Sequence, residues 1–178
     1  MSRALTCPIP ESTNPLYPST FVFSVNKLPD MTFFVQDVNL PEVSLGEANY
    51  ATRLSDIPVP GDKLNFGNIT VSFMVDEAYK NFKALTEWII ALGYPEENEQ
   101  FTKFIRGQDN FLDEHLKTVS DATLGILDSE MKPVAVYSFV DCFPISVGGF
   151  DFTSQSTDSN PLKATATFAY NYFILETP

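Results

Sequence analysis

The chain has 178 residues, enough for one domain with a sizeable core, and its 16 phenylalanines supply ample core material. The formal net charge of −12 argues against nucleic-acid binding, because neutralising phosphate groups requires clustered Lys and Arg, although it is compatible with a protein that encloses DNA without gripping it. The N-terminus has no apolar signal segment and no apolar run could span a bilayer, so we predict neither a secretory signal nor a membrane partner.

Residues 1–18 contain four prolines and several small polar residues, which predicts an irregular N-terminal arm. An arm of this kind often gains order only against a partner. We expect residues 19–178 to form a single β domain. Its first two strands are predicted at 21–25 and 31–38, where apolar and polar residues alternate. Lys27-Leu28-Pro29-Asp30 supplies turn residues between them, so this stretch favours a β-hairpin.

The alternating pattern breaks between residues 40 and 61, where prolines and glycines recur. Loops of about 20 residues in a compact domain are usually functional or disordered. This segment is too apolar for simple disorder, so we predict an extended loop or flap that packs on another subunit. The expected contact residues are its large apolar ones: Leu45, Tyr50, Leu54, Ile57 and Val59.

Residues 63–75 give the clearest strand, because apolar and polar residues alternate there with a period of two. An amphipathic helix follows, with apolar residues recurring at three- and four-residue steps over 79–92. Asp76 is the expected N-cap, and a glycine and a proline end the helix. Trp88 falls on the apolar stripe and is therefore expected in the core.

Residues 96–120 are polar and charged, which predicts an insertion or long connection. The last third of the chain is expected to be all strand. Strands at 122–127 and 133–139 are joined by a polar turn, a break at Phe143-Pro144 precedes a further strand at 145–152, and a strand at 163–175 ends the chain. The predicted fold class is mainly β with one principal helix, as an antiparallel β-sandwich or barrel.

The sequence offers no recognisable catalytic or metal-binding motif. The adjacent carboxylates Asp76-Glu77 and Glu96-Glu97 suit a helix cap and a solvated face better than an acid–base pair. His115 is expected to be an ordinary surface histidine. Cys7 and Cys142 form no CxxC pair and are expected to be free thiols, with a disulfide between subunits through Cys7 as the alternative. We therefore expect no enzyme, no metal and no cofactor.

The ordered combination of elements resembles the tail-tube proteins of contractile-tailed bacteriophages. The resemblance lies in PVPGDKLNFGNITVSFMVDE running into a helix with a Trp, in ILDSEMKPVAVYSFVDCFPISVGGFDF, and in the closing strand ATATFAYNYFILE. It covers about residues 20–175 and is weakest at 96–120. The ordered combination of these segments carries the resemblance.

The resemblance implies a virion protein of the tail, assembled in the host cytoplasm. Six copies would form a ring by joining their sheets into an inner barrel, and the rings would stack into a tube that conducts DNA during ejection. The flap at 40–61 would reach the neighbouring ring, and the tail sheath and baseplate proteins would be partners. The long N-terminal arm and the 96–120 stretch depart from a minimal tube subunit, which leaves a tube-initiating baseplate ring as an alternative.

A conduit for DNA should repel phosphate, and the excess of 23 acidic over 11 basic residues fits that requirement. The strands expected to line the channel, at 63–75, 133–139 and 163–175, are poor in acids. The negative charge is therefore expected at turns and strand ends, on Asp62, Asp76, Asp128, Glu130 and Asp141. The competing interpretation is a β-sandwich module of a virion that binds a receptor or a carbohydrate, which exposed aromatic clusters on loops would favour.

Overall fold

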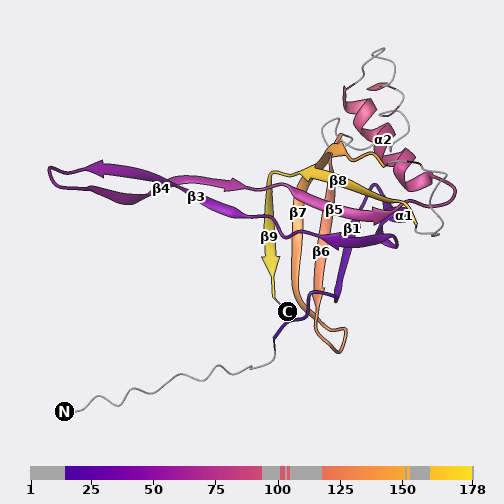
Figure 1. Cartoon of the computed structure of the whole chain (residues 1–178), viewed down its shortest axis with the longest axis horizontal. Helices are drawn as coiled ribbons and strands as arrows, with labels where there is room; N and C mark the ends of the chain where they lie inside the picture. Colours follow the sequence, from indigo (N-terminus) through magenta and orange to yellow (C-terminus); the bar gives the residue numbers. More distant parts are fainter. Residues whose placement is uncertain are drawn as a thin grey trace.

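The computed structural model describes residues 15–93, 101–102, 104, 118–150, 152 and 161–177 (Figure 1). Cys7, His115 and most of the predicted arm and insertion lie outside the described residues. The strands are β1 (Phe21–Val25), β2 (Val35–Val38), β3 (Val43–Ala51), β4 (Asp56–Phe66), β5 (Ile69–Met74), β6 (Ser120–Leu127), β7 (Pro133–Val147), β8 (Lys163–Ala169) and β9 (Tyr172–Glu176). The helices are α1 (Pro29–Thr32) and α2 (Lys80–Gly93). The prediction of a mainly β protein with one principal helix is confirmed.

The long strand β7 organises the main sheet, whose order is β1-β6-β7-β8-β5-β2 with β9 also paired to β7. The first part of β7 pairs with β6 and β9, and its second part pairs with β8. We call β1, β6, β9 and the first part of β7 the β6 half, and the second part of β7 with β8, β5 and β2 the β8 half. All of these pairs are antiparallel. Among the described strands the sheet stays open from β1 to β2 and does not close into a barrel.

One core joins the two halves of the sheet. The β6 half contributes Phe23, Leu124 and Phe139, and the β8 half contributes Val71, Phe73, Ala166 and Phe168, all in one cluster of buried side chains. On β5 and β8, buried residues alternate with partly or fully exposed ones, as the period of two requires. Leu85 and Trp88 bring α2 into the same core.

The predicted hairpin of residues 21–38 is wrong. β1 pairs with β6 and β2 pairs with β5, so the two strands lie at opposite ends of the main sheet. The intervening residues form the short helix α1, which has Pro29 in its first turn, where a proline costs no hydrogen bond. Met31, which the alternation predicts on a strand, is buried on this helix.

The predicted flap is a regular two-stranded ribbon rather than a loop. β3 and β4 pair antiparallel from Val43↔Phe66 to Ala51↔Asp56, and the ribbon projects far from the main sheet (Figure 1). The predicted strand 63–75 is divided between β4 and β5. Between the β2–β5 pair and the β3–β4 pair, the Gly67 N–H donates to the Glu42 carbonyl oxygen (2.8 Å) and the Asn39 N–H donates to the Thr70 carbonyl oxygen (3.0 Å). These two bonds continue the pairing from one pair of strands to the other. The ribbon is thus the extension of the β2–β5 hairpin.

The C-terminal third has the predicted β6–β7 hairpin, but two other boundaries differ. The predicted break at Phe143-Pro144 is absent, because β7 continues to Val147. The irregular point of this strand is instead Asp141, whose φ is 55°. The predicted strand 163–175 is instead two strands, β8 and β9, which turn at Tyr170-Asn171 from one half of the sheet to the other.

Helix α2 begins at Lys80, so the prediction that Asp76 is its N-cap is wrong. Instead the side chain of Asn81, which is 2% exposed, binds the chain entering the helix. Its Oδ1 accepts a hydrogen bond from the Asp76 N–H at 3.2 Å, and its Nδ2 donates one to the Met74 carbonyl oxygen at 2.8 Å. The helix start is therefore fixed to the end of β5 by a buried amide. Trp88 is 2% exposed, which confirms that it is a core residue.

Candidate assembly surface

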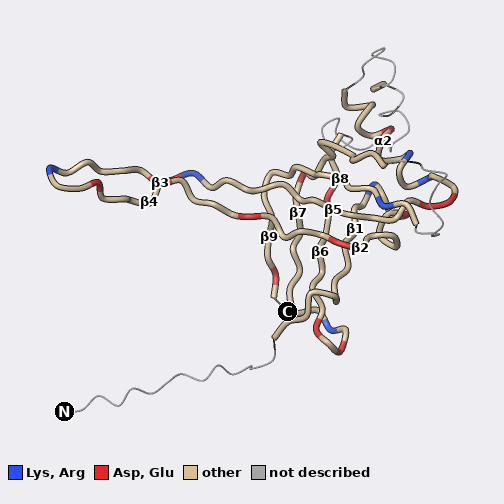
Figure 2. The backbone as a smooth tube through the Cα atoms, viewed as in Figure 1, with Lys and Arg blue, Asp and Glu red and all other residues tan. Residues whose placement is uncertain are grey.

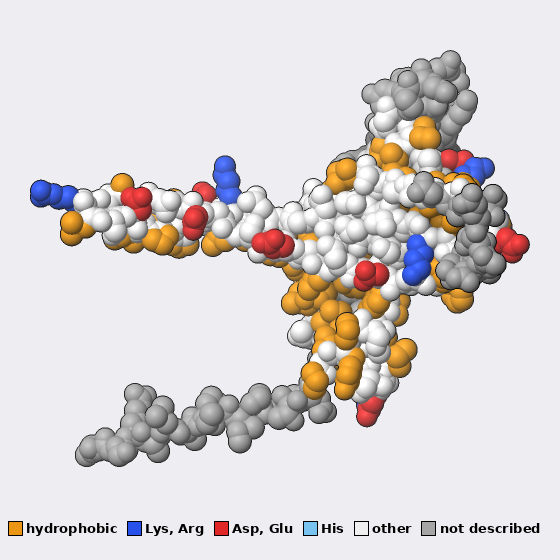
Figure 3. All heavy atoms as spheres, in the orientation of Figure 1, with side chains coloured by type: hydrophobic (Ala, Val, Ile, Leu, Met, Phe, Trp, Pro, Cys, Tyr) orange, Lys and Arg blue, Asp and Glu red, His pale blue; other side chains and the backbone are white. Residues whose placement is uncertain are grey.

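The ribbon exposes many large apolar side chains. All five predicted contact residues lie on it, and Leu54, in the turn at its tip, is 95% exposed. Tyr50 lies directly opposite Ile57, and Val59 opposes Ala48 two positions further along the same face, because alternate residues of a strand share a face. The hydrophobic side chains of the ribbon gather mainly along one of its long sides (Figure 3).

Leu45 lies apart from this distal group. It opposes Leu64 near the base of the ribbon, on the other side of an irregularity between Leu45 and Glu47. Val43, which lies in the predicted flap but was not among the predicted contacts, and Leu64, which lies in the predicted strand 63–75, are also exposed there. Gly67-Asn68 separates β4 from β5, and this sequence signal could have shown that Leu64 does not share the alternation that continues from Ile69.

Aromatic residues fix the base of the ribbon to the main sheet. The ring of Phe66 lies 6.0 Å from that of Tyr170 and 5.5 Å from that of Phe173, measured between centroids. Phe139 packs against the same two rings at 4.9 Å and 5.9 Å. The corner between β8 and β9 therefore holds the point from which the ribbon leaves.

On the solvent side of the β8 half, neighbouring strands place Ser and Thr hydroxyl groups next to one another. Thr70 on β5 pairs with Thr167 on β8, Ser72 pairs with Thr165, and Ser146 on β7 also pairs with Thr167. The opposite side of the same strands is core. Of the strands expected to line a channel, the second half of 63–75 and the first half of 163–175 lie side by side here, whereas 133–139 belongs to the β6 half.

The predicted channel carboxylates do not form one cluster (Figure 2). Asp128 and Glu130 share the β6–β7 turn, where Asp128 Oδ1 accepts hydrogen bonds from the N–H groups of Glu130 (2.8 Å) and Lys132 (2.9 Å). Asp62 lies on the ribbon, Asp76 follows β5, and Asp141 lies at the bend of β7. Asp141 Oδ2 accepts a hydrogen bond from Asn171 Nδ2 at 2.7 Å.

Cys142 is fully buried beside this bend. Burial, and secondarily the Asp121 carboxylate, raises the pKa of its thiol to about 12. Burial also raises the pKa of Tyr170, with Cys142 as a lesser cause. Both groups stay neutral at physiological pH, so they belong to the core and not to a reactive site.

The described residues hold no group of three or more His, Cys, Asp or Glu side chains placed to bind a metal ion. Among them there is also no helix with the length and apolar character needed to cross a membrane. What the described part of the molecule offers is surface: an exposed apolar ribbon, a hydroxyl face and open strand edges. Exposed apolar surface and open strand edges are features typical of surfaces that pack against other molecules.

The sequence matches the family described as phage tail tube protein over residues 10–176. The chain belongs to this family, and it is a structural tube protein. No curated protein matches the sequence at a significant level.

Solved structures share the fold at low identity. A chain of the anti-feeding prophage (AFP) baseplate, solved by cryo-EM and 6-fold symmetrised, has a TM-score of 0.63 at 13% identity, covering 93% of this chain and 98% of that chain. The AFP tube-terminating cap has a TM-score of 0.60 at 15% identity, with 99% and 100% covered. A sheath–tube complex of an extracellular contractile injection system, PVC, has 0.58 at 18% identity, with 93% and 94% covered.

Proposed function

We propose that this chain assembles into hexameric rings that stack into the inner tube of a contractile tail. The observation that carries the proposal is the ribbon, whose apolar side chains project from the main sheet where no described part of the same chain covers them. Exposed apolar surface of this kind marks an interface. The 6-fold symmetry given for the similar AFP baseplate supports six copies per ring.

The ring closes where the open edges of the β8 half, β2 on one side and the second part of β7 on the other, join those of neighbouring copies. Closure of this kind leaves no unpaired edge, and a head-to-tail contact repeated around an axis is the usual way to build a ring. The tail sheath and the baseplate are the outer and terminal partners. The particle is a virion tail, assembled in the host cytoplasm.

The hydroxyl face of Thr70, Ser72, Ser146, Thr165 and Thr167 lines the channel in this proposal. Hydroxyl groups offer DNA no positive charge, so the duplex slides past them during ejection. The carboxylates Asp62, Asp76, Asp128, Glu130 and Asp141 contribute scattered negative charge, which the symmetry multiplies. The purified protein is expected to show no affinity for duplex DNA even at low salt, where cationic contacts would be strongest.

The test is the mass and shape of the purified full chain. Light scattering at high concentration should give six-fold multiples of the 19.9 kDa chain. Negative-stain microscopy should show rings or tubes. A strict monomer that also fails to polymerise on an initiating complex would sink the proposal, and tight, salt-sensitive DNA binding would sink its conduit part.

The second candidate is a baseplate ring that initiates the tube, or a ring that ends it. It is favoured by the similarity in fold to both the AFP baseplate chain and the AFP cap. The two functions differ in the product of assembly. A tube protein extends into long tubes on an initiating complex, whereas a baseplate or terminal ring stops after a single layer.

A further inference from the structure

The tip of the ribbon is a turn whose shape is fixed by hydrogen bonds. It spans residues 52–55, just beyond the last paired residues of β3 and β4. The Thr52 N–H donates to the Ser55 carbonyl oxygen at 3.0 Å, and the Ser55 N–H donates to Thr52 Oγ1 at 3.2 Å. Arg53 and the exposed Leu54 form the centre of this turn, and Arg53 makes no ion pair within the described part of the chain. Figure 2 shows a basic residue at the tip, with acidic residues further back along the ribbon.

A groove of about 810 Å³ lies at the end of the β6 half, between the chain that leads into β1 and the β6–β7 turn. Its lining is partly apolar and partly acidic, and consists of Pro15, Leu16, Tyr17, Asp128, Ser129, Glu130 and Val134. Leu16, Tyr17 and Val134 are exposed. The groove therefore offers a partner apolar surface next to two carboxylates.

Hydrogen bonds fix both walls of this groove. On one wall, Thr20 Oγ1 donates to the Leu127 carbonyl oxygen at 2.7 Å, and the Leu127 N–H donates to the Thr20 carbonyl oxygen at 3.0 Å. On the other wall, Asp128 Oδ1 accepts hydrogen bonds from two N–H groups of the turn. Glu130 pairs with Lys132 at 2.6 Å, whereas Asp128 forms no ion pair with any described residue. Asp128 therefore brings an unmatched negative charge to the groove.

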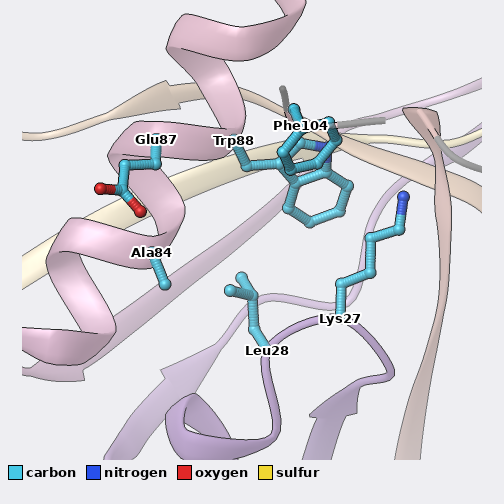
Figure 4. A pocket seen from close by; sticks show the side chains of 6 residues that line it. All are labelled: Lys27, Leu28, Ala84, Glu87, Trp88 and Phe104. Carbon is cyan, nitrogen blue, oxygen red and sulfur yellow. The ribbon is translucent and has the colours of Figure 1, made fainter. Parts of the chain in front are cut away.

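A smaller cavity, of about 350 Å³, lies between α2 and the corner where β1 leads into α1, and its charges are matched within the chain (Figure 4). The Lys27 side chain extends toward two rings of the lining, with Nζ 5.3 Å from the centroid of the Trp88 ring and 5.5 Å from that of Phe104. The carboxylate of the lining, Glu87, pairs with Lys83 at 3.6 Å. This cavity therefore does not select a charged partner as the groove at the β6–β7 turn does.

We propose that the ribbon tip of one copy inserts into the groove at the β6–β7 turn of a second copy in the adjacent ring. Leu54 packs on the apolar residues of the groove, and the Arg53 guanidinium donates charge-assisted hydrogen bonds to the Asp128 carboxylate. This contact rests on the proposed function, since it joins copies in adjacent rings. It also takes Asp128 out of the scattered channel charge, which then comes from the other four carboxylates.

One chain does not make this contact with itself. Its ribbon projects away from the main sheet, whereas the groove lies at the end of the β6 half, beside the β6–β7 turn (Figure 1). The tip and the groove are different surfaces, so their contact is head-to-tail. A head-to-tail contact leaves a free tip and a free groove at the two ends of every assembly, and it can therefore repeat along a stack.

The first experiment replaces Leu54 with the photoreactive amino acid p-benzoylphenylalanine in the full chain, irradiates the assembled tubes and maps the cross-linked peptides by mass spectrometry. Links should join position 54 to residues 15–17 or 128–134 of a second copy, and they should be absent from isolated single rings. The same group at the exposed Phe33 is the control and should not link to the groove. Links only to other surfaces, including residues 1–14, or equal linking within single rings, would overturn the contact while the tubes uphold the proposed function. A protein that forms no tubes would overturn both.

The second experiment tests the charge pair without a bulky probe. Arg53→Gln and Asp128→Asn should each raise the protein concentration needed for tube formation several-fold, and the double variant should need no more than either single one, because all three lack the same pair. Asn at position 128 keeps an oxygen for the turn N–H groups, and the mass of single rings should stay unchanged. Glu87→Gln, which removes a carboxylate on α2, is the control and should assemble like the wild type. Independent effects that multiply in the double variant, or no effect of either single change, would overturn the Arg53–Asp128 contact.

Discussion

A methyl group at the Cα of Gly61 would lie 2.5 Å from the carbonyl oxygen of Gly46 across the ribbon. Gly61 therefore allows β4 to approach the backbone of β3 at Gly46, where the register shifts. Glycine is used where one backbone approaches another this closely. The ribbon owes its shape at this point to the absence of a side chain.

Gly61→Ala should loosen the ribbon without unfolding the core. Hydrogen exchange of amides within residues 43–66 should become faster, because the strands must separate to fit the methyl group, while amides of β5 and β8 should keep their protection. The matched control is Gly46→Ala, whose added carbon would meet its nearest neighbour, the Lys63 carbonyl oxygen, at an ordinary 3.5 Å. Equal protection of the ribbon in both variants would contradict the prediction.

Replacing both Ile57 and Val59 with Asp should leave the domain folded and block stacking. The two side chains are 49% and 41% exposed in the single chain, so the change costs the monomer little. In an apolar interface, an unpaired charge costs several kcal/mol. Light scattering and microscopy measure the result. The control is the double variant Asn49→Asp, Ala51→Asp, which adds two negative charges to the other face of the same segment. Tubes of normal length from the Ile57/Val59 variant would show that this face is not an interface.

Trp88→Ala should lower the free energy of unfolding by about 3–5 kcal/mol, because it removes a buried ring and its hydrogen bond to Thr118. Denaturant titration followed by circular dichroism measures the loss, since the variant has no tryptophan to report by fluorescence. Trp88→Phe keeps most of the ring and should lose less. Unchanged stability in Trp88→Ala would contradict a structural role.

Asn81→Ala should cost about 1–3 kcal/mol, because the Met74 carbonyl oxygen and the Asp76 N–H each lose a hydrogen-bond partner. The loss is measured by the same titration. Asn65→Ala, at an exposed position on the ribbon, should change stability by less than about 0.5 kcal/mol. If the two variants are equally stable, Asn81 does not hold the start of α2.

The Cys142 thiol should make stability fall at alkaline pH. Its pKa is raised from 9.0 to about 12 in the folded protein, so its contribution is complete below pH 9 and is lost as the pH rises toward 12, where the unfolded chain alone gives up the proton. The free energy of unfolding of the wild type should decrease more steeply across this window than that of Cys142→Ala, by about 1 kcal/mol per pH unit. Parallel pH profiles for the two proteins would refute the assignment.

The sequence predicted the fold class and several elements where local pattern and tertiary structure agree. The alternation around Val71 and Phe73 identified β5, and the stripe containing Leu85 and Trp88 identified α2. These patterns are strong because one face of each element is buried in the core. The polar turn at 128–132 likewise predicted the β6–β7 hairpin.

The errors arose where non-local pairing decides the structure. Nothing local in residues 21–25 indicates that they pair with residues 122–126 rather than with their neighbours. The ribbon is exposed on both faces, so it has no core-facing alternation, and its prolines and glycines read as a loop. Asp76 resembled an N-cap, but the buried amide of Asn81 took that place. The apolar residues of the ribbon were proposed as contacts from their composition, and this assignment stays a prediction. Leu64 was not among them because it lay inside the predicted strand 63–75.

Continuous backbone pairing from β2–β5 into the ribbon, with Phe66 clamped by Tyr170 and Phe173, makes the ribbon a lever. We expect a sideways displacement at the Leu54 tip to be carried along the paired strands toward β5, and through β5 to its partner β8. If the rings stack as proposed and each ribbon contacts the next ring, bending the tube would displace the ribbons. Each displaced ribbon would then strain the main sheet of its own subunit, so the ribbons would make the tube stiffer against bending.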